Sequence, residues 1–300
     1  MRVLAVVVTH NRRELLSRCI DHLQGQVGVV PDILVINNAS TDGTDAMLVA
    51  LGVDFLTQEN VGSAGGWHRG IEVAVERGYG AVWLMDDDGY PDKSALQQLV
   101  AVLRPGVACA SAVVVCEDEP SRFVFPFPRL DRSGLPRIFA FPRKISSVKG
   151  LAAVAEEGTY PFAHFFNGAL IDLAATRQVG NVERAFFIFG DEVDYFFRLR
   201  KVGEVRSVVS ALHYHPDVSQ RPYTPAKIYY YVRNTLVLNR RYFNAVLLRN
   251  AMAIFIALGR TARRNGLSEA VSYVFGRNAP VLRRAVVSGI QGKLGKDFDG

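Results

Sequence analysis

The feature that most constrains the fold is an alternation of short β-branched segments with segments of helical period over the first 90 residues. Residues 2–8, 32–36, 53–56 and 81–85 are predicted strands, and each ends in a polar loop. Residues 12–24 carry apolar side chains at three- and four-residue spacing, which is typical of a helix packed on a sheet. This order predicts an α/β fold with a doubly wound, mostly parallel sheet and helices on both faces. Ligands of such sheets bind beyond the carboxyl ends of the strands.

The fourth predicted strand ends on three consecutive carboxylates, Asp86, Asp87 and Asp88, followed by Gly89. Taken alone, a solvated acidic turn is the more common explanation of such a triplet. Adjacent acids repel each other, however, and a divalent cation with oxygen ligands and a bound phosphate would make the cluster favourable. Together with the neighbouring loops, the triplet is a candidate site for Mn²⁺ or Mg²⁺.

A glycine-rich turn at residues 60–66 (Asn-Val-Gly-Ser-Ala-Gly-Gly) opens a helix predicted to run to about residue 77. Its glycines would let the backbone approach an anion at a helix N-terminus. The turn lacks the Gly-Lys-Ser/Thr ending of a P-loop, and its glycine spacing does not match the dinucleotide fingerprint. A phosphate-binding turn and a plain tight turn both fit the pattern.

Positive charge is concentrated in the last part of the chain. Residues 221–300 contain 14 Lys or Arg against 3 Asp or Glu, whereas the formal charge of the whole chain is only +6. A nucleic-acid reader normally carries its positive face on the folded domain, so nucleic acid is excluded as a partner. A cationic segment next to anionic lipid fits better.

The apolar residues within 245–258 are interrupted by Arg249 and are too few to span a bilayer. They predict either an amphipathic helix in the membrane interface or a helix buried in a core or a dimer. We therefore expect an α/β domain over residues 1–220 and a basic helical region over residues 221–300. The sequence does not decide whether the chain forms a homo-oligomer.

The three cysteines, Cys19, Cys109 and Cys116, form no Cys-x-x-Cys motif and leave an odd number, which favours a reduced compartment. The apolar N-terminal segment is too short for a signal peptide. We expect a cytoplasmic protein that associates peripherally with the inner face of the cell membrane.

Four motifs in order resemble the family 2 glycosyltransferases of the GT-A fold. They are the end of the first strand at residues 7–11 (Val-Val-Thr-His-Asn), residues 37–44 (Asn-Asn-Ala-Ser-Thr-Asp-Gly-Thr), the turn at 60–66, and residues 83–89 (Trp-Leu-Met-Asp-Asp-Asp-Gly). The resemblance is greatest to bacterial galactofuranosyltransferases, followed by rhamnosyltransferases. It implies an inverting, metal-dependent enzyme that transfers galactofuranose from UDP-galactofuranose to a cell-surface glycan or lipid-linked acceptor. The alternative donor is dTDP-rhamnose.

The resemblance also implies a set of site residues. Metal ligands would be Asp86 and Asp88 with one of His213 and His215, and we favour His213 because it lies nearer the end of the strand predicted at 205–212. The nucleotide-sugar donor would contact Thr9, Asn37, Asn38, Asp42, Asn60, Gly65, Gly66 and Asp87. The acceptor would contact Trp83, Asn167 and Gly168.

A second acidic cluster, Asp191 and Glu192, opens a predicted helix after a run of aromatic residues. Negative charge is stabilised at a helix N-terminus, so capping alone could account for either residue. The resemblance implies that Glu192 is the base that removes the acceptor hydroxyl proton, with Asp191 beside it. Sugar transfer requires such a base.

Residues 117–143 are rich in Pro, Phe and Arg without a clear period, and they predict an insertion loop. It would either form part of an acceptor pocket or be a surface excursion. Two competing functions are a nucleotidyltransferase and a non-catalytic sugar-nucleotide-binding protein. The first is expected to carry a basic glycine-rich loop where this chain has residues 9–11, and the presence of two acidic clusters argues against the second.

Overall fold

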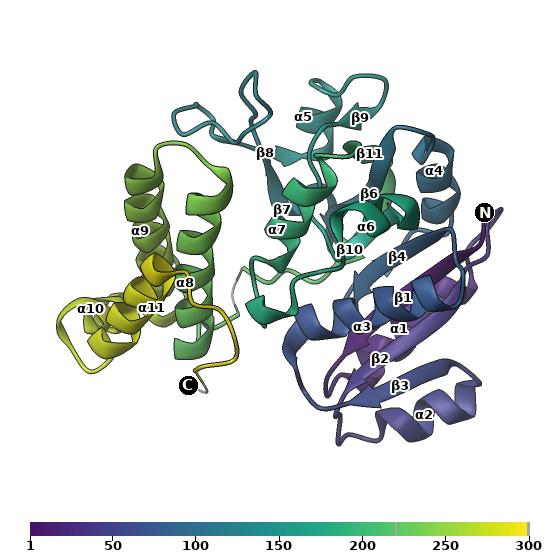
Figure 1. Ribbon diagram of the computed structural model, residues 1–300, viewed down its shortest axis with the longest axis horizontal. Helices are drawn as coiled ribbons and strands as arrows, with labels where there is room; N and C mark the ends of the chain where they lie inside the picture. Colours follow the sequence, from purple (N-terminus) through teal and green to yellow (C-terminus); the bar gives the residue numbers. More distant parts are fainter. Residues whose placement is uncertain (220, 299–300) are drawn as a thin grey trace.

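The computed structural model describes residues 1–219 and 221–298, and it shows an α/β domain with a group of C-terminal helices beside it (Figure 1). The main sheet has the order β3-β2-β1-β4-β10-β6-β11-β5. Its strands and those attached to it are β1 (Val3–Thr9), β2 (Asp32–Asn38), β3 (Asp54–Gln58), β4 (Ala81–Asp86), β5 (Tyr90–Pro91), β6 (Val107–Cys116), β7 (Glu119–Pro128), β8 (Lys144–Ser147), β9 (Thr159–Tyr160), β10 (Asn167–Asp172) and β11 (Glu204–His215). The helices are α1 (Arg13–Gln24), α2 (Thr44–Leu51), α3 (Gly62–Glu76), α4 (Ala95–Val102), α5 (Val148–Ala152), α6 (Leu173–Val179), the 3₁₀ helix η1 (Arg184–Phe186), α7 (Asp191–Leu199), α8 (Pro225–Tyr242), α9 (Val246–Asn265), α10 (Leu267–Phe275) and α11 (Ala279–Gln291).

The predicted parallel sheet is confirmed. Strand β1 pairs in parallel with β2 and with β4, so that Val7 lies between Val35 and Met85. Strands β6 and β11 are also parallel, and β10 runs antiparallel between β4 and β6. Strands β2 and β3 lie on one side of β1, and β4 lies on the other. The strand order therefore reverses at β1, and open α/β sheets bind their ligands at such a reversal.

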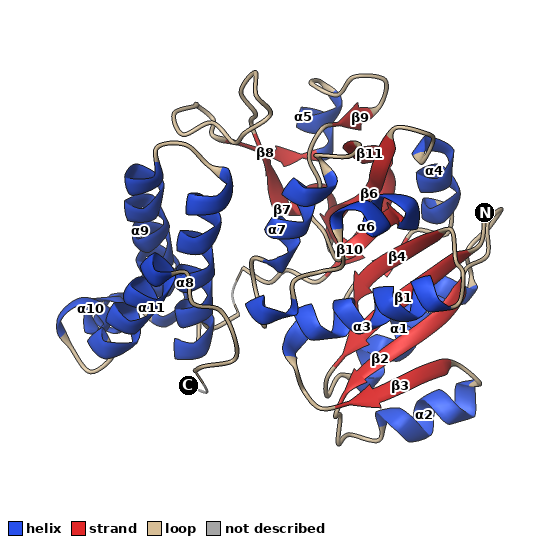
Figure 2. Ribbon diagram, viewed as in Figure 1, coloured by secondary structure: helices blue, strands red, loops and turns tan. Residues whose placement is uncertain are grey.

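Helices cover both faces of the sheet, as predicted (Figure 2). On one face, α1, α2 and α4 pack on alternate residues of β1 such as Ala5 and Val7. On the other face, α3, α6 and α7 pack on the residues between them, including Leu4 and Val6. Every residue of β1 is buried, which a strand covered on both sides requires.

The prediction of an irregular insertion at residues 117–143 is wrong for its first half. Residues Glu119–Pro128 form β7, which pairs with β6 and β8. Phe123 and Phe127 are buried in a small core beneath it. The aromatic side chains of this segment do recur every second residue, as in a strand. The prolines argued against a strand in the sequence, because proline is tolerated in a strand only at an edge or an irregularity. The pairing of β7 is irregular at that place.

Helices α8 to α11 form a second core around Tyr229, Tyr230 and Tyr273. Helix α9 buries Ala253 and Ala257 in this core. For that face of the helix, the structure supports the alternative of a helix buried in a core. Within the described residues, no helix combines the length and apolar character needed to cross a membrane. Helix α8 is tied to the α/β domain, because the Asn234 side-chain amide donates to the carbonyl of Ile188 at 2.9 Å.

Candidate active site

The carboxyl ends of β1, β2 and β4 meet at one edge of the sheet. Thr9 ends β1, Asn38 ends β2 and Asp86 ends β4. The strand register places Thr9 beside Asn37 and Val8 beside Asp86. This edge lies at the reversal of strand order, where a ligand is expected. The structure therefore brings together, at the expected place, the residues Thr9, Asn37 and Asn38 that were predicted to contact the donor.

Asp87 is buried and is held by two donors from the connection between β1 and α1. The Thr9 hydroxyl donates to Oδ2 at 2.7 Å, and the Arg12 guanidinium donates to Oδ1 at 2.8 Å. Burial raises the pKa of Asp87, and the charge of Arg12 opposes this shift. The predicted donor residues Thr9 and Asp87 are therefore in direct contact with each other.

Asp88 is the most extensively paired acid of the triplet. His215 Nε2 lies 3.0 Å from Oδ1, while Arg12 and Arg221 lie 3.0 and 2.8 Å from Oδ2. Burial favours the neutral form, but the hydrogen bond and charge of His215, together with the arginines, hold the pKa of Asp88 well below its usual range. Asp88 is therefore ionised at neutral pH.

Asp86 lacks such partners: within the described chain, no hydrogen bond to its carboxylate is found. Burial, followed by the charges of Asp88 and Asp87, raises its pKa to about 8. A carboxylate that lies among other acids without a donor is stabilised when a cation binds there.

Asp86, Asp88 and His215 offer carboxylate oxygens and an imidazole nitrogen, which are ligand types that Mn²⁺ accepts. Among the described residues, no three His, Cys, Asp or Glu side chains are gathered closely enough to hold an ion as they stand. The Arg221 guanidinium donates to an oxygen of Asp88 that a cation would need. The residues fit a divalent cation in kind, and Arg221 has to leave Asp88 for the ion to bind.

The structure gives the two histidines different contacts, and which of them binds a metal stays a prediction. His213 is fully buried, and a Cβ atom on Gly89 would lie only 2.3 Å from its Nε2. Burial lowers the pKa of His213 to about 3, and neither ring nitrogen has a partner in the described chain. His215 is the histidine that reaches Asp88. Strand β11 continues to His215, three residues beyond the strand end predicted from the sequence.

The two asparagines after β2 use their side-chain amides within the protein. Asn37 Nδ2 donates to Asp45 Oδ1 at 2.6 Å. Asn38 Nδ2 donates to the carbonyl of Gly62 at 3.1 Å, and both asparagines are buried. These bonds join the loop after β2 to the starts of α2 and α3.

Asp42 and Asn60 hold the two neighbouring turns. The Asp42 carboxylate accepts the hydroxyl of Thr44 at the start of α2. Asn60 Oδ1 accepts the amide of Gly62 at 3.1 Å. The structure thus gives both residues a role in loop shape, and their contact with a donor stays a prediction.

The glycine turn is explained by packing. A Cβ atom on Gly66 would lie 2.5 Å from Cγ1 of Val8, so this glycine allows α3 to approach β1 closely. A Cβ atom on Gly65 would lie 2.4 Å from Cγ2 of Val61. The amide of Ala64 in the first turn of α3 donates to the carbonyl of Phe187 at 3.2 Å. These contacts favour a tight turn over a phosphate cradle.

Of the three predicted acceptor residues, Trp83 is wrong. It lies in the middle of β4, is fully buried and belongs to the core under α1 and α4. Asn167 and Gly168 lie at the start of β10. Asn167 pairs with Met85 of β4, and the register of the two strands shifts between Asn167 and Ala169. The Asn167 Oδ1 atom is buried without a partner in the described chain, which leaves it available to a ligand. Gly168 makes room for His213.

Asp191 and Glu192 begin α7, and the amide of Gly190 donates to Glu192 Oε2 at 2.6 Å. Burial and the adjacent Glu192 raise the pKa of Asp191 well above its usual range, and Asp86 adds to the shift. Burial also raises the pKa of Glu192. Asp191 is the less exposed of the two side chains, and its pKa is the more strongly raised.

The sequence predictions did not include Arg12 and Arg221, the two arginines on Asp88. Arg12 directly follows the loop at the end of β1, and this position in the sequence could have indicated that Arg12 lies near the site. Arg221 lies 133 residues from Asp88 in the chain, so no local pattern could connect them.

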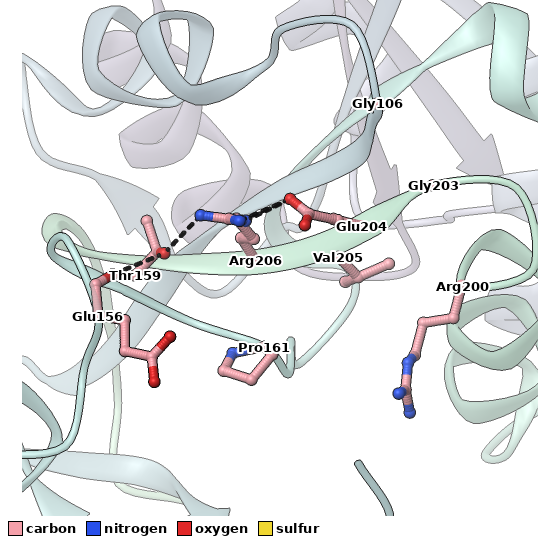
Figure 3. Close-up of a pocket in the computed structure, with 9 residues that line it drawn as sticks. All are labelled: Gly106, Glu156, Thr159, Pro161, Arg200, Gly203, Glu204, Val205 and Arg206. Carbon is pink, nitrogen blue, oxygen red and sulfur yellow. Dashed lines mark hydrogen bonds and ion pairs between the residues drawn. The ribbon is translucent and has the colours of Figure 1, made fainter. Parts of the chain in front are cut away.

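A cavity lies elsewhere, away from the acidic clusters. It has a volume of about 460 Å³ and is lined by Gly106, Thr159, Arg200 and Arg206, among others (Figure 3). Gly106 and Glu204 stand at the amino ends of the parallel strands β6 and β11, whereas His215 and the acids lie at the carboxyl ends. Glu204 and Arg206 pair with each other. We therefore do not assign this cavity to the donor.

Comparisons with known proteins agree with this geometry. The model of glycosyl transferase family 2 matches residues 4–146. Galactofuranosyltransferase GlfT1 of Mycobacterium tuberculosis is 31% identical over 222 residues, which are 71% of this chain and 70% of that protein. GlfT1 of Mycolicibacterium smegmatis is 30% identical over 221 residues, with the same coverage.

Solved structures show the same fold. GalNAc-T7 with UDP, GalNAc and Mn²⁺ has a TM-score of 0.59 at 13% identity, covering 82% of this chain and 49% of that one. The mannosyltransferase PcManGT of Pyrobaculum calidifontis, in complex with GDP-Man and Mn²⁺, has a TM-score of 0.55 at 16% identity, covering 97% and 80%. Sheet, motifs and relatives agree, and the chain belongs to glycosyltransferase family 2, with galactofuranosyltransferases among its relatives.

Proposed function

We propose that this chain is an inverting galactofuranosyltransferase that uses UDP-galactofuranose and passes the sugar to a cell-surface glycan or a lipid-linked acceptor. The observation that carries the proposal is the pair of acidic clusters on neighbouring elements: the Asp86–Asp88 triplet ends β4, and the Asp191–Glu192 pair begins α7 just after Phe187, whose carbonyl accepts the amide of Ala64 in α3. The choice of sugar is supported by the identity to GlfT1. The rhamnosyl alternative rests on the sequence resemblance alone.

In the proposed reaction, Glu192 removes the proton from the acceptor hydroxyl, and the oxygen attacks the anomeric carbon of the donor. The bond from that carbon to the diphosphate breaks on the opposite side, so UDP leaves and the configuration inverts. Burial raises the pKa of Glu192, and the hydrogen bond with Asp191 opposes this shift. A base with a pKa raised towards neutral suits this proton transfer.

Asp86, Asp88 and His215 would hold Mn²⁺ or Mg²⁺, which when bound offsets the negative charge of the diphosphate. Arg12 and Arg221 are the cations that compensate Asp88 in the structure described here. At this edge of the sheet these guanidinium groups would be placed to contact phosphate oxygens of the donor, for which arginine is well suited.

The donor is tested by adding UDP-galactofuranose, UDP-galactopyranose and dTDP-rhamnose separately to the protein, with Mn²⁺ or with EDTA. We expect metal-dependent thermal stabilisation and slow hydrolysis with UDP-galactofuranose only. Stabilisation by dTDP-rhamnose alone would establish the rhamnosyl alternative. Binding without any hydrolysis or transfer would indicate a non-catalytic nucleotide-sugar-binding protein.

We also propose that the enzyme works at the cytoplasmic face of the membrane, where a lipid-linked acceptor is available. The excess of basic residues over residues 221–300 supports association with anionic lipid. Co-sedimentation of the whole chain with anionic vesicles tests this association, and a protein that stays in the supernatant at low salt argues against it.

A further inference from the structure

Two loops that are far apart in the sequence meet at one corner of the molecule. Residues 129–143 connect β7 to β8, and residues 243–249 comprise the connection from α8 to α9 with the first turn of α9 (Figure 1). The Arg249 guanidinium donates to the carbonyl of Pro136 at 3.1 Å and thereby joins them. We call this pair of loops the tip.

The tip exposes three large apolar side chains. The exposed fractions are 84% for Phe139, 103% for Phe141 and 86% for Leu247. Such side chains remove no surface from water in the folded chain, so they contribute nothing to the stability of the fold. Adjacent exposed apolar side chains mark an interaction site in a soluble domain.

The tip is also strongly basic. Residues 129–144 contain five Lys or Arg against one acid, Asp131. The Asp131 carboxylate is used within its own turn, where it accepts the Ser133 hydroxyl. Within the described chain, Arg132, Arg137 and Arg143 are exposed and form no ion pair. Aromatic residues surrounded by free cations are the combination that binds the interface of an anionic bilayer.

Strand β7 links the tip to the active site. The Phe125 ring packs edge-on against His215, with 5.6 Å between ring centroids. Pro128, at the end of β7, lies about 10 Å farther along the strand, which advances about 3.3 Å per residue. Strand β7 therefore leads from the surroundings of His215 to the start of the tip.

From these observations we propose that the tip, with Phe139 and Phe141 as anchors, docks the enzyme on an anionic lipid bilayer. The inference rests on the proposed membrane association and names its contact surface. It places that surface at the tip and not on the face of α9 that carries Ala253 and Ala257, because these residues are buried in the helical core.

The test compares three variants of the full chain by co-sedimentation with vesicles. The first replaces both anchors (Phe139→Ser with Phe141→Ser), and the second reverses charge at Arg137 and Arg143 (both to Glu). The matched control is Phe275→Ser, which removes an 88% exposed phenylalanine of α10 outside the tip. The vesicles consist of phosphatidylcholine either alone or mixed with phosphatidylglycerol, at low and high salt.

We expect the anchor variant to bind the mixed vesicles at least about tenfold more weakly, and the charge variant to lose the preference for phosphatidylglycerol. The Phe275 variant should bind like the wild type. Loss of binding in the Phe275 variant alone would overturn the proposal in favour of the C-terminal helices. Unchanged binding of both tip variants would also overturn it.

UDP binding and donor hydrolysis without vesicles separate this proposal from the proposed function. Both should be unaltered in the tip variants, since no tip residue contacts the acidic clusters. The tip could instead bind a second copy of the chain, which size-exclusion chromatography tests. An oligomer that dissociates in the anchor variant would identify such a copy and refute the lipid contact.

Discussion

Asp86 and Asp88 are two residues apart, yet their environments predict opposite effects on stability. Asp86 has no hydrogen-bond donor in the described chain, and its pKa is about 8 compared with 3.8 for the ordinary residue. Asp88 has three cationic partners and a lowered pKa. We therefore expect Asp86→Asn to stabilise the metal-free protein at neutral pH and Asp88→Asn to destabilise it.

The magnitudes follow from proton linkage. Between about pH 4 and pH 8 the unfolded chain has lost the Asp86 proton while the folded chain keeps it, so stability falls as the pH rises. Each pKa unit corresponds to about 1.4 kcal/mol, and with a discount for the partial solvent contact of Asp86 the penalty at pH 7 is about 2 to 4 kcal/mol. The Asn variant lacks this penalty.

Asp88 contributes with the opposite sign. Its lowered pKa supplies stability that is present above the ordinary aspartate pKa and is lost as the pH falls through the folded value. Replacing it with Asn leaves Arg221 without its carboxylate, whereas Arg12 keeps its ion pair with Asp87. Because the side chains of Arg12 and Arg221 are 42% and 38% exposed, we expect a loss of only about 1 to 3 kcal/mol at pH 7.

The assay is urea unfolding of the wild type and both variants from pH 4 to pH 9 in EDTA. The curves of wild type and Asp86→Asn should meet near pH 4 and separate up to about pH 8. Mn²⁺ should then stabilise the wild type and have little effect on Asp86→Asn. If both substitutions change stability in the same direction at pH 7, the assigned charges of the triplet are wrong.

Three further predictions concern the base, the arginine on the metal site and the C-terminal segment. Glu192→Gln should lower transfer by about two to four orders of magnitude at unchanged UDP affinity, with a smaller effect for Asp191→Asn; wild-type rates in Glu192→Gln would exclude it as the base. Arg221→Ala should tighten Mn²⁺ binding severalfold without donor, as measured by calorimetry, and equal affinity would contradict competition for the site. Asp297→Asn should cost about 1 to 3 kcal/mol in urea unfolding, because Arg233 is fully buried and pairs with that 31% exposed carboxylate; unaltered stability would show that the pair contributes little.

The sequence by itself determined the layered α/β architecture and the edge of the sheet that carries the site. Hydrophobic period is a local property, and strands followed by helices at this spacing admit few arrangements. The acidic triplet could be predicted to lie at that edge because it directly follows a buried strand. Asp191 and Glu192 were recognised as a pair by the resemblance, since both lie at the start of one helix.

Only the tertiary structure decided which side chains meet. His215 and not His213 reaches Asp88, because β11 extends farther than its composition indicated. Trp83 turned out to be a core residue, since the sheet is covered on both faces. Arg221 reaches the triplet across 133 residues of chain. Such contacts depend on strand register and on the packing of distant segments, and neither leaves a periodic signal in the sequence.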